Sequence, residues 1–240
     1  MYNEFAEVYD LLIDTDYESF ASYYTEIFKK YNLSPSLIAD LGCGTGTMAH
    51  IMSREGYDVI GIDASPEMLS IAKQKHGDIL FLNQSLTEFE LYGTVDAAYS
   101  SLDCINYLTE DGELSKLFAL VKNYLNPGGI YIFDISSYHK LSKVLGNNTF
   151  VFEDENIFYT WENYFEDDIL EMTLTFFKKN GSLYERFEEE QIQRAYKTDE
   201  ICSIAEASGL SVLGVFDNLS FADVKNDSER VFFVLRKDDL

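Results

Sequence analysis

The sequence contains few of the residues from which disulfide frameworks and metal centres are built. Only three cysteines and three histidines occur among its 240 residues. The cysteines form no C-x-x-C pair, and the histidines show no spacing typical of metal ligands, so neither a disulfide framework nor a zinc site is expected. These residues are Cys43, Cys104, Cys202, His50, His76 and His139.

Basic residues are also scarce. The chain has 18 lysines and arginines against 42 aspartates and glutamates, which gives a formal net charge of −24. Such a surface repels nucleic-acid phosphates and anionic lipids, so we expect no nucleic-acid partner and a small neutral or cationic substrate instead. Solubility alone would also explain the acidic surface.

Long apolar runs are absent as well. No stretch of eighteen apolar residues is present, and the first residues lack the basic and apolar regions of a signal peptide, so a cytoplasmic protein without a membrane partner is expected. Apolar residues nevertheless make up 46% of the chain, enough for one α/β core with a modest insertion. The sequence does not indicate an oligomeric state.

Apolar spacing predicts alternating helices and strands over the first 148 residues. Two amphipathic helices come first, around residues 5–12 and over 17–30. Further helices are expected at 47–54, from Ser65-Pro66 onward, at 114–125 and at 137–145. Strands separated by helices predict right-handed βαβ units and a parallel sheet covered on both faces. The predicted strands are 37–41, 57–62, 79–82, 95–100 and 130–135.

The pattern changes to strand-like alternation over residues 150–196, which are rich in aromatic and acidic side chains. A hairpin turn is predicted at Lys179-Asn180-Gly181-Ser182. We expect an antiparallel insertion over the edge of the main sheet. A helix capped by Thr198 and strands at 210–216 and 230–236 follow it. The predicted division is therefore a core over 1–148, an insertion over 149–197, and a completion of the core over 198–240.

One segment, Ile38 to Gly46, carries the strongest functional signal. A strand ends in a turn with alternate glycines, Gly42, Gly44 and Gly46, and a helix follows. Glycine allows a ligand to touch the backbone, and the first turn of a helix presents free N–H groups. Asp40, before the first glycine, suits a ligand with an ammonium group better than a pyrophosphate.

The second signal is Asp63 at the end of the next predicted strand. In a doubly wound sheet, an acid at this place can accept hydrogen bonds from both hydroxyls of a ribose. Either signal alone has a local explanation, as turn chemistry or as a helix start. Their occurrence on adjacent strands is more specific.

These segments resemble motifs I and II of class I S-adenosylmethionine (SAM)-dependent methyltransferases. The matching residues are Asp40-Leu-Gly-Cys-Gly-Thr-Gly46 and Gly61-Ile-Asp-Ala-Ser-Pro-Glu-Met-Leu69, and Leu125-Asn-Pro-Gly-Gly129 is similar to the family's lead into its fifth strand. The segment Tyr2 to Asp10 resembles small bacterial members with an N-terminal helical lid and a β-insertion after that strand. The resemblance implies a doubly wound, seven-stranded, mostly parallel Rossmann-like sheet whose last strand is antiparallel.

The resemblance also implies SAM as the cofactor and assigns residues to it. The glycines would approach its methionine and ribose parts, Asp40 its amino group, Asp63 the ribose hydroxyls, and Ala64 and Met68 the adenine. Ser85 stands where the family often has an aspartate for the adenine amino group, which departs from the family pattern, and the Leu86 N–H could still serve that contact. Tyr2, Tyr9 and Tyr17 could close over the sulfonium. The predicted cofactor set is Tyr17, Asp40, Gly42, Cys43, Gly44, Gly46, Asp63, Ala64, Met68, Ser85, Leu86, Ser101 and Leu102.

Methyl transfer requires alignment above all, and a general base only for a protonated acceptor. Candidates near the predicted strand ends are Asp103, Asn106, Tyr107, Asp134 and His139, of which we select His139, Asp103 and Tyr107 as catalytic. Relatives often carry a histidine where Gln191 stands, so that base is not assumed here. The predicted acceptor is a small molecule, with cationic or amine-bearing compounds favoured.

Three other functions are compatible with parts of the pattern. Gly44 to Ala49 matches G-x-G-x-x-A, which would suit an NAD-dependent dehydrogenase, but that reading ignores Asp40 and Gly42. Aminopropyl transfer from decarboxylated SAM would use the same fold. A non-catalytic SAM-binding module could use the acidic, aromatic insertion as an interaction surface.

Overall fold

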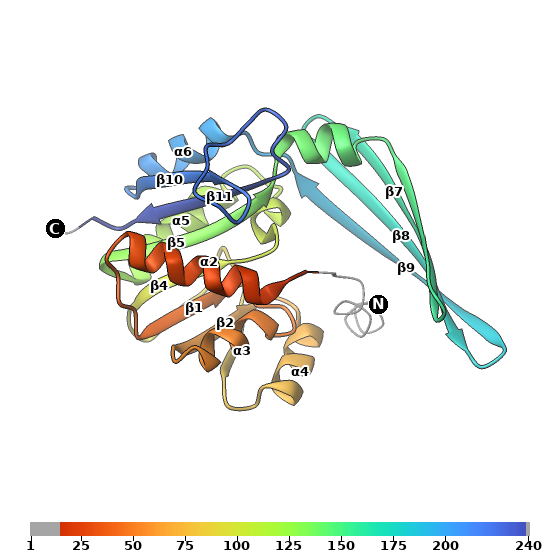
Figure 1. Cartoon of the computed structure of the whole chain (residues 1–240), viewed down its shortest axis with the longest axis horizontal. Helices are drawn as coiled ribbons and strands as arrows, with labels where there is room; N and C mark the ends of the chain where they lie inside the picture. The colour runs from red at the N-terminus through yellow and green to blue at the C-terminus, as the bar shows by residue number, and fades with distance from the viewer. Residues whose placement is uncertain (1–14, 239–240) are drawn as a thin grey trace.

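The computed structural model describes residues 15–238, so the helix expected around residues 5–12 and the tyrosines Tyr2 and Tyr9 lie outside the described residues. Two sheets dominate the architecture, one of seven strands and one of four (Figure 1). The helical elements are α2 (Tyr17–Lys30), α3 (Thr47–Arg54), α4 (Pro66–Lys75), the 3-10 helix η1 (Cys104–Tyr107), α5 (Glu113–Tyr124), the π-helix η2 (Lys140–Leu145) and α6 (Thr198–Ala207).

The seven-stranded sheet has the order β10-β11-β5-β4-β1-β2-β3. Strands β3, β2, β1, β4 and β5 pair in parallel, whereas β11 runs antiparallel to both β5 and β10. The order reverses at β1, and ligands of open α/β sheets bind outside the carboxyl ends of strands at such a point. These strands are β1 (Leu37–Leu41), β2 (Asp58–Asp63), β3 (Leu80–Asn83), β4 (Val95–Ser100), β5 (Leu125–Ser136), β10 (Ser211–Asp217) and β11 (Arg230–Arg236).

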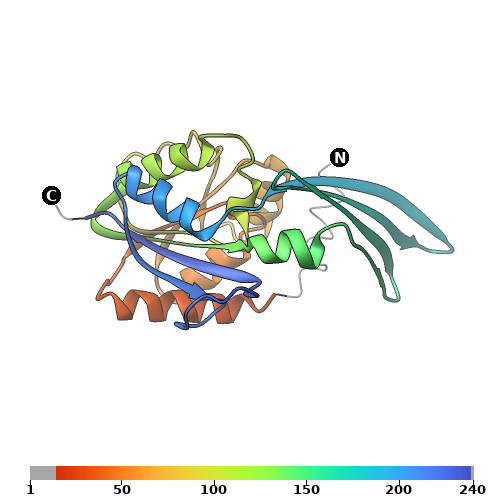
Figure 2. The same ribbon diagram turned by 90° about the horizontal axis from the view of Figure 1, so that it is seen from above.

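Helices cover both faces of this sheet (Figure 2). Alternate residues of β5 serve the two faces: Ile130 and Ile132 pack with α2, α3 and α4, while Tyr131 and Phe133 pack with α5 and α6. Side chains of a strand point alternately to opposite faces, so strands with apolar residues at successive positions fit between two helical layers. The predicted doubly wound fold is therefore confirmed.

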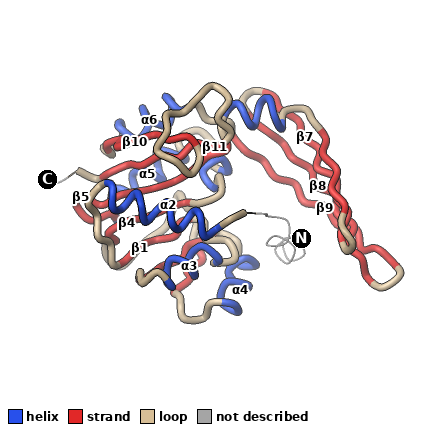
Figure 3. The backbone as a smooth tube through the Cα atoms, in the orientation of Figure 1, coloured by secondary structure: helices blue, strands red, loops and turns tan. Residues whose placement is uncertain are grey.

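The second sheet is the predicted antiparallel insertion, with the order β6 (Thr149–Glu153), β7 (Ile157–Glu166), β8 (Ile169–Asn180) and β9 (Leu183–Arg194). Gly181, with φ +63°, lies in the β8–β9 turn where the hairpin was expected. The sheet starts beside the carboxyl end of β5 and slants outward, so its far hairpin lies well away from the core (Figures 1 and 3). It does not lie flat over the edge of the main sheet.

Several boundaries differ from the sequence expectation, most of them by a single residue. Strand β5 begins at Leu125 and includes Asn126 to Gly129, because Leu125 leaves α5 in an extended conformation and pairs with Val95. Lys197, rather than Thr198, occupies the N-cap position of α6. Strand β2 extends through Asp63, which pairs with Asn83 of β3. Proline disfavours a helical conformation at the residue before it, which explains why α5 stops short of Pro127.

Candidate active site

The three glycines of the turn after β1 have positive φ values of 84°, 51° and 76°, but their surroundings differ. A β-carbon on Gly42 would lie 2.2 Å from the Cys104 sulfur, and one on Gly46 would lie 2.8 Å from the Phe81 ring. A β-carbon on Gly44 would meet nothing within 4 Å. Gly42 and Gly46 therefore allow close packing, whereas Gly44 presents backbone to open space where a ligand can approach.

Asp40, at the end of β1, lies beneath this turn and is only 1% exposed. Its Oδ2 is buried and has no hydrogen-bond partner among residues 15–238. Burial raises the pKa of this carboxyl to about 8. A buried carboxylate is costly without a partner, so this oxygen is suited to a cationic ligand group. The ammonium group of SAM fits this requirement.

Asp63 connects the two strand ends that carry the motifs. Its Oδ2 accepts a hydrogen bond from the Gly44 N–H at 2.8 Å, and its Oδ1 accepts one from the Ser65 N–H at 2.8 Å. Burial raises the pKa of this carboxyl. The Asp63 side chain therefore fixes both turns in addition to its predicted place beside the ribose. Each carboxylate oxygen has further lone pairs for ribose hydroxyls.

The predicted adenine side follows β2 and β3. Ser65 caps α4 by accepting a hydrogen bond from the Met68 N–H at 3.1 Å, as its sequence context predicts. Asn83 donates to the carbonyls of Asp63 and Ala64 at 3.0 and 2.9 Å. Ser85 is engaged locally, with its hydroxyl 3.0 Å from that of Thr87. Leu86 packs against the core.

Beyond β4 the chain makes a turn in which Leu102 and Asp103 both have positive φ, 61° and 52°. Asp134 of β5, fully buried, holds this turn by accepting the N–H groups of Leu102 and Asp103 at 2.8 and 3.0 Å. Arg230 of β11 pairs with both carboxylates. Burial raises the pKa of Asp134, and Arg230 opposes that shift. Asp134 is therefore committed to structure rather than to proton transfer.

These elements surround one pocket at the carboxyl ends of the strands. Tyr17, the first residue of α2, forms one wall, as predicted. Three wall residues were not predicted: Thr45 in the glycine turn, and Thr47 and Met48 at the start of α3. The free N–H groups expected at that helix start were the signal that could have identified them. The pocket is lined by Tyr17, Asp40, Gly42, Cys43, Gly44, Thr45, Thr47, Met48, Ser101 and Leu102.

The remaining predicted cofactor residues do not line this pocket. Of these, Asp63 is joined to the pocket residue Gly44 by the hydrogen bond described above. Met68 belongs to a hydrophobic cluster with Phe176 and Phe187 of the insertion, which brings α4 and the second sheet together at the side predicted for adenine. The assignment of individual residues to SAM therefore stays a prediction.

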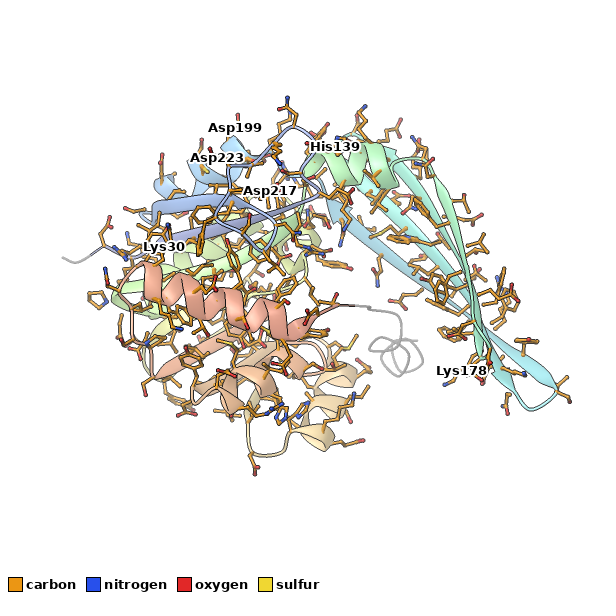
Figure 4. All side chains as sticks on the ribbon, viewed as in Figure 1. Lys30, His139, Lys178, Asp199, Asp217 and Asp223 are labelled. Carbon is orange, nitrogen blue, oxygen red and sulfur yellow. The ribbon has the colours of Figure 1, made fainter. Side chains whose placement is uncertain are left out.

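The three catalytic candidates occupy different environments. Asp103 accepts a hydrogen bond from Gln193 at 2.7 Å in addition to its ion pair with Arg230. Tyr107 is 45% exposed, and its hydroxyl donates to Gln191 at 2.7 Å. His139 precedes η2 at its N-cap position and does not line the pocket (Figure 4).

Within residues 15–238 no three histidine, cysteine, aspartate or glutamate side chains are grouped so that they could hold a metal ion. None of the helices in this range combines the length and apolarity needed to cross a membrane.

Comparison with known proteins finds relatives that are methyltransferases by name. Residues 38–129 match the model of a methyltransferase domain family. The Bacillus subtilis (strain 168) protein YqeM, assigned as a methyltransferase, is 34% identical over 245 residues, which cover 99% of this chain and 97% of the relative. The crystal structure of a SAM-dependent methyltransferase from Clostridium acetobutylicum is 36% identical, with a TM-score of 0.92 and 99% coverage of both chains.

A more distant relative has a named substrate. The dTDP-3-amino-3,4,6-trideoxy-alpha-D-glucopyranose N,N-dimethyltransferase of Streptomyces venezuelae is 28% identical over 130 residues, which cover 53% of this chain and 55% of the relative.

Proposed function

Because the chain belongs to the class I SAM-dependent methyltransferases, we propose that it methylates a nitrogen atom of a small, amine-bearing acceptor. The single observation that carries the SAM site is Asp40, a buried carboxylate with an unpartnered oxygen below a glycine turn that is open at Gly44. The amino-sugar N,N-dimethyltransferase relative supports the amine. The net charge of −24 favours attraction of a cationic compound to the protein.

SAM, when bound, supplies a methyl carbon activated by its sulfonium. The residues of the chain have the task of positioning. Asp40 binds the ammonium group, Asp63 the ribose, and the Gly44 backbone lies against the ligand. Tyr17 and the Leu102 turn close the pocket from the sides of α2 and β4. Such positioning is the main contribution that a protein makes to in-line displacement.

A neutral amine reacts through its own lone pair and loses its proton after the methyl carbon has transferred, so a strong base in contact with the nitrogen is not required. We assign Asp103 a positioning role because Gln193 and Arg230 engage its carboxylate. The proton released by the methylated amine passes to solvent water, and we assign Tyr107 an orienting role, since it lies on η1 next to the Leu102 turn and its hydroxyl donates to Gln191.

The first experiment compares cofactors. SAM and S-adenosylhomocysteine should raise the melting temperature, whereas NAD and NADP should not. Stabilisation by NAD alone would favour a dehydrogenase. SAM binding without turnover across libraries of amines, phenols and carboxylic acids would favour a non-catalytic SAM-binding module, and turnover of phenols alone would contradict the amine.

The second experiment tests the orientation of the cofactor. Asp63→Ala should weaken SAM binding by about 1.5–3 kcal/mol, the scale of a hydrogen bond to a charged group. Because Asp63 also holds Gly44 and Ser65, the melting temperature of the unliganded variant should fall by about 2–4 °C for each kcal/mol lost. A lower melting temperature with unchanged SAM affinity in calorimetry would mean that Asp63 is structural only.

A further inference from the structure

The two faces of the insertion sheet differ in burial. One face carries the buried side chains of β8, Leu170, Met172 and Phe176, and the buried Phe187 of β9. The other face exposes Tyr164, Tyr184 and Ile192, which are 54%, 60% and 49% exposed. Alternation along each strand assigns every residue to one face or the other.

Glu189 of β9 lies on the buried face, because it is two residues from Phe187 and pairs with Leu174 of β8. Glu189 is only 5% exposed. Within residues 15–238 its carboxylate has no hydrogen bond or ion pair, in contrast to Glu188 next to it, which binds Thr175 and Arg186. Burial raises the pKa of the Glu189 carboxyl. An acid in this setting is stabilised by a cation brought to it.

The same face of β9 leads to the cofactor pocket. Gln193 binds Asp103, which follows the pocket residue Leu102, and Gln191 binds Tyr107. Glu189 is the next residue on this face after Gln191. At about 3.4 Å per residue, its α-carbon lies about 14 Å from that of Gln193. Glu189 therefore lies on the strand face that reaches the pocket residues, but at a distance from the pocket.

The surroundings of Glu189 on this face are aromatic and contain polar atoms without partners. The rings of Phe176 and Phe187 stack at a centroid distance of 4.8 Å. The indole N–H of Trp161 and the Oδ1 of Asn163 are buried and have no hydrogen-bond partner among the described residues. Aromatic faces attract the alkylated head of an ammonium group, and the free donor and acceptor can bind polar groups of the same molecule.

We propose that Glu189 recognises a second, charged ammonium group of the acceptor, remote from the nitrogen that is methylated. The two nitrogens need different environments. A nitrogen paired with a carboxylate keeps its proton and has no lone pair for attack, whereas the reacting nitrogen must be neutral at the cofactor. The acceptor class is therefore a diamine or polyamine, or an amine with a quaternary ammonium group at its other end. The inference rests on the proposed function and specifies its substrate.

The test uses the full-length protein saturated with S-adenosylhomocysteine. Calorimetry measures the binding of α,ω-diamines of increasing length, with α,ω-diols of the same length for comparison. The wild type should prefer the diamines. Glu189→Gln should weaken diamine binding by about ten- to hundredfold, as for the loss of a charged hydrogen bond. Glu190→Gln, on the exposed face of the same strand, is the matched control and should bind diamines like the wild type.

Three results would overturn the inference: failure of the wild type to bind any diamine, equal binding of diamines and α,ω-diols of the same length, or equal effects of the two variants. SAM affinity, measured in parallel, should be the same in all three proteins. A wild type that binds no SAM would contradict the proposed function itself. A wild type that binds SAM and methylates monoamines but ignores the second ammonium group would contradict only the role of Glu189.

Discussion

The core sheet and the insertion sheet differ in how their strands are covered. In the core, β5 buries every residue from Ile130 to Ser136, whereas β6 of the insertion exposes every residue from Thr149 to Glu153. A strand packed between two helical layers fixes the loops at its ends. Substitutions on the open face of an antiparallel sheet have less effect on the fold. The difference agrees with the proposed division, in which the core binds the cofactor and the insertion recognises the acceptor.

Polar contacts at the base of the insertion supplement the apolar packing of Met68 against Phe176 and Phe187. Asn106 of η1 donates to the carbonyls of Ser136 and Arg194 at 3.1 and 2.9 Å and accepts the Ser136 N–H at 2.9 Å. Tyr138 binds Asp168 at 2.7 Å in the β7–β8 turn. These bonds attach the base of the insertion to the carboxyl ends of β4 and β5.

The largest effect should come from removing most of the insertion. Residues 151–190 would be replaced by a short Gly/Ser linker, which retains Gln191, Gln193 and Tyr196 because they contact the core. Acceptor methylation should be lost, while SAM binding measured by calorimetry should be nearly intact. Circular dichroism confirms folding. Methylation of the same acceptor at the wild-type rate would place recognition elsewhere.

A smaller effect, confined to the core, is expected for Asp40→Asn. SAM affinity should fall by about ten- to hundredfold through the loss of a charged partner. Wild-type affinity should rise as pH increases toward about 8, where Asp40 ionises in the unliganded protein; the variant should lack this rise. A pH-independent wild type would show that Asp40 binds no cation.

The same substitution should change stability in the opposite direction. Because the pKa of Asp40 is higher in the folded than in the unfolded chain, its contribution to the free energy of unfolding is fully present below about pH 4 and is lost as pH rises to about 8. Urea unfolding without cofactor should therefore show Asp40→Asn gaining stability over wild type across this range. A constant difference between the two proteins would contradict the assignment.

The glycines of the turn should separate packing from ligand approach. Gly42→Ala places a β-carbon against Cys104 and should destabilise the protein by about 1–3 kcal/mol through overpacking, in addition to backbone strain. Gly44→Ala introduces only the strain of a left-handed residue, which costs about 1–2 kcal/mol of stability. It should in addition weaken SAM binding by about tenfold beyond what this loss of stability explains. Equal SAM affinity in wild type and Gly44→Ala would mean that no ligand approaches there.

The smallest effects should appear where the sheets meet. Tyr107→Phe removes one exposed hydrogen bond to Gln191, worth about 0.5–1.5 kcal/mol, so the methylation rate should fall only a few-fold. His139→Gln should have no greater effect, because His139 does not line the pocket. A loss of about a thousandfold in the methylation rate of either variant would show that the reaction depends on a general base rather than on alignment alone.

Local sequence patterns predicted most of the elements for a physical reason. The spacing of Phe20, Tyr24 and Ile27 predicts α2, and Ser65-Pro66 predicts the start of α4, since helix periodicity and capping depend on neighbours along the chain. The glycines, Asp40 and Asp63 were identified for the same reason: each lies where its own strand ends.

The sequence by itself therefore determined the fold class, the glycine turn after β1 and the position of the insertion along the chain. The tertiary structure decided which side chains meet. Arg230 reaches Asp134 across 96 residues, and Gln193 reaches Asp103 across 90. It also decided that Asp63 fixes two turns and that Glu189 is buried while Glu190 is not. Such pairings depend on the order of the strands and on the direction of the second sheet. Both are determined jointly by residues that are distant along the chain.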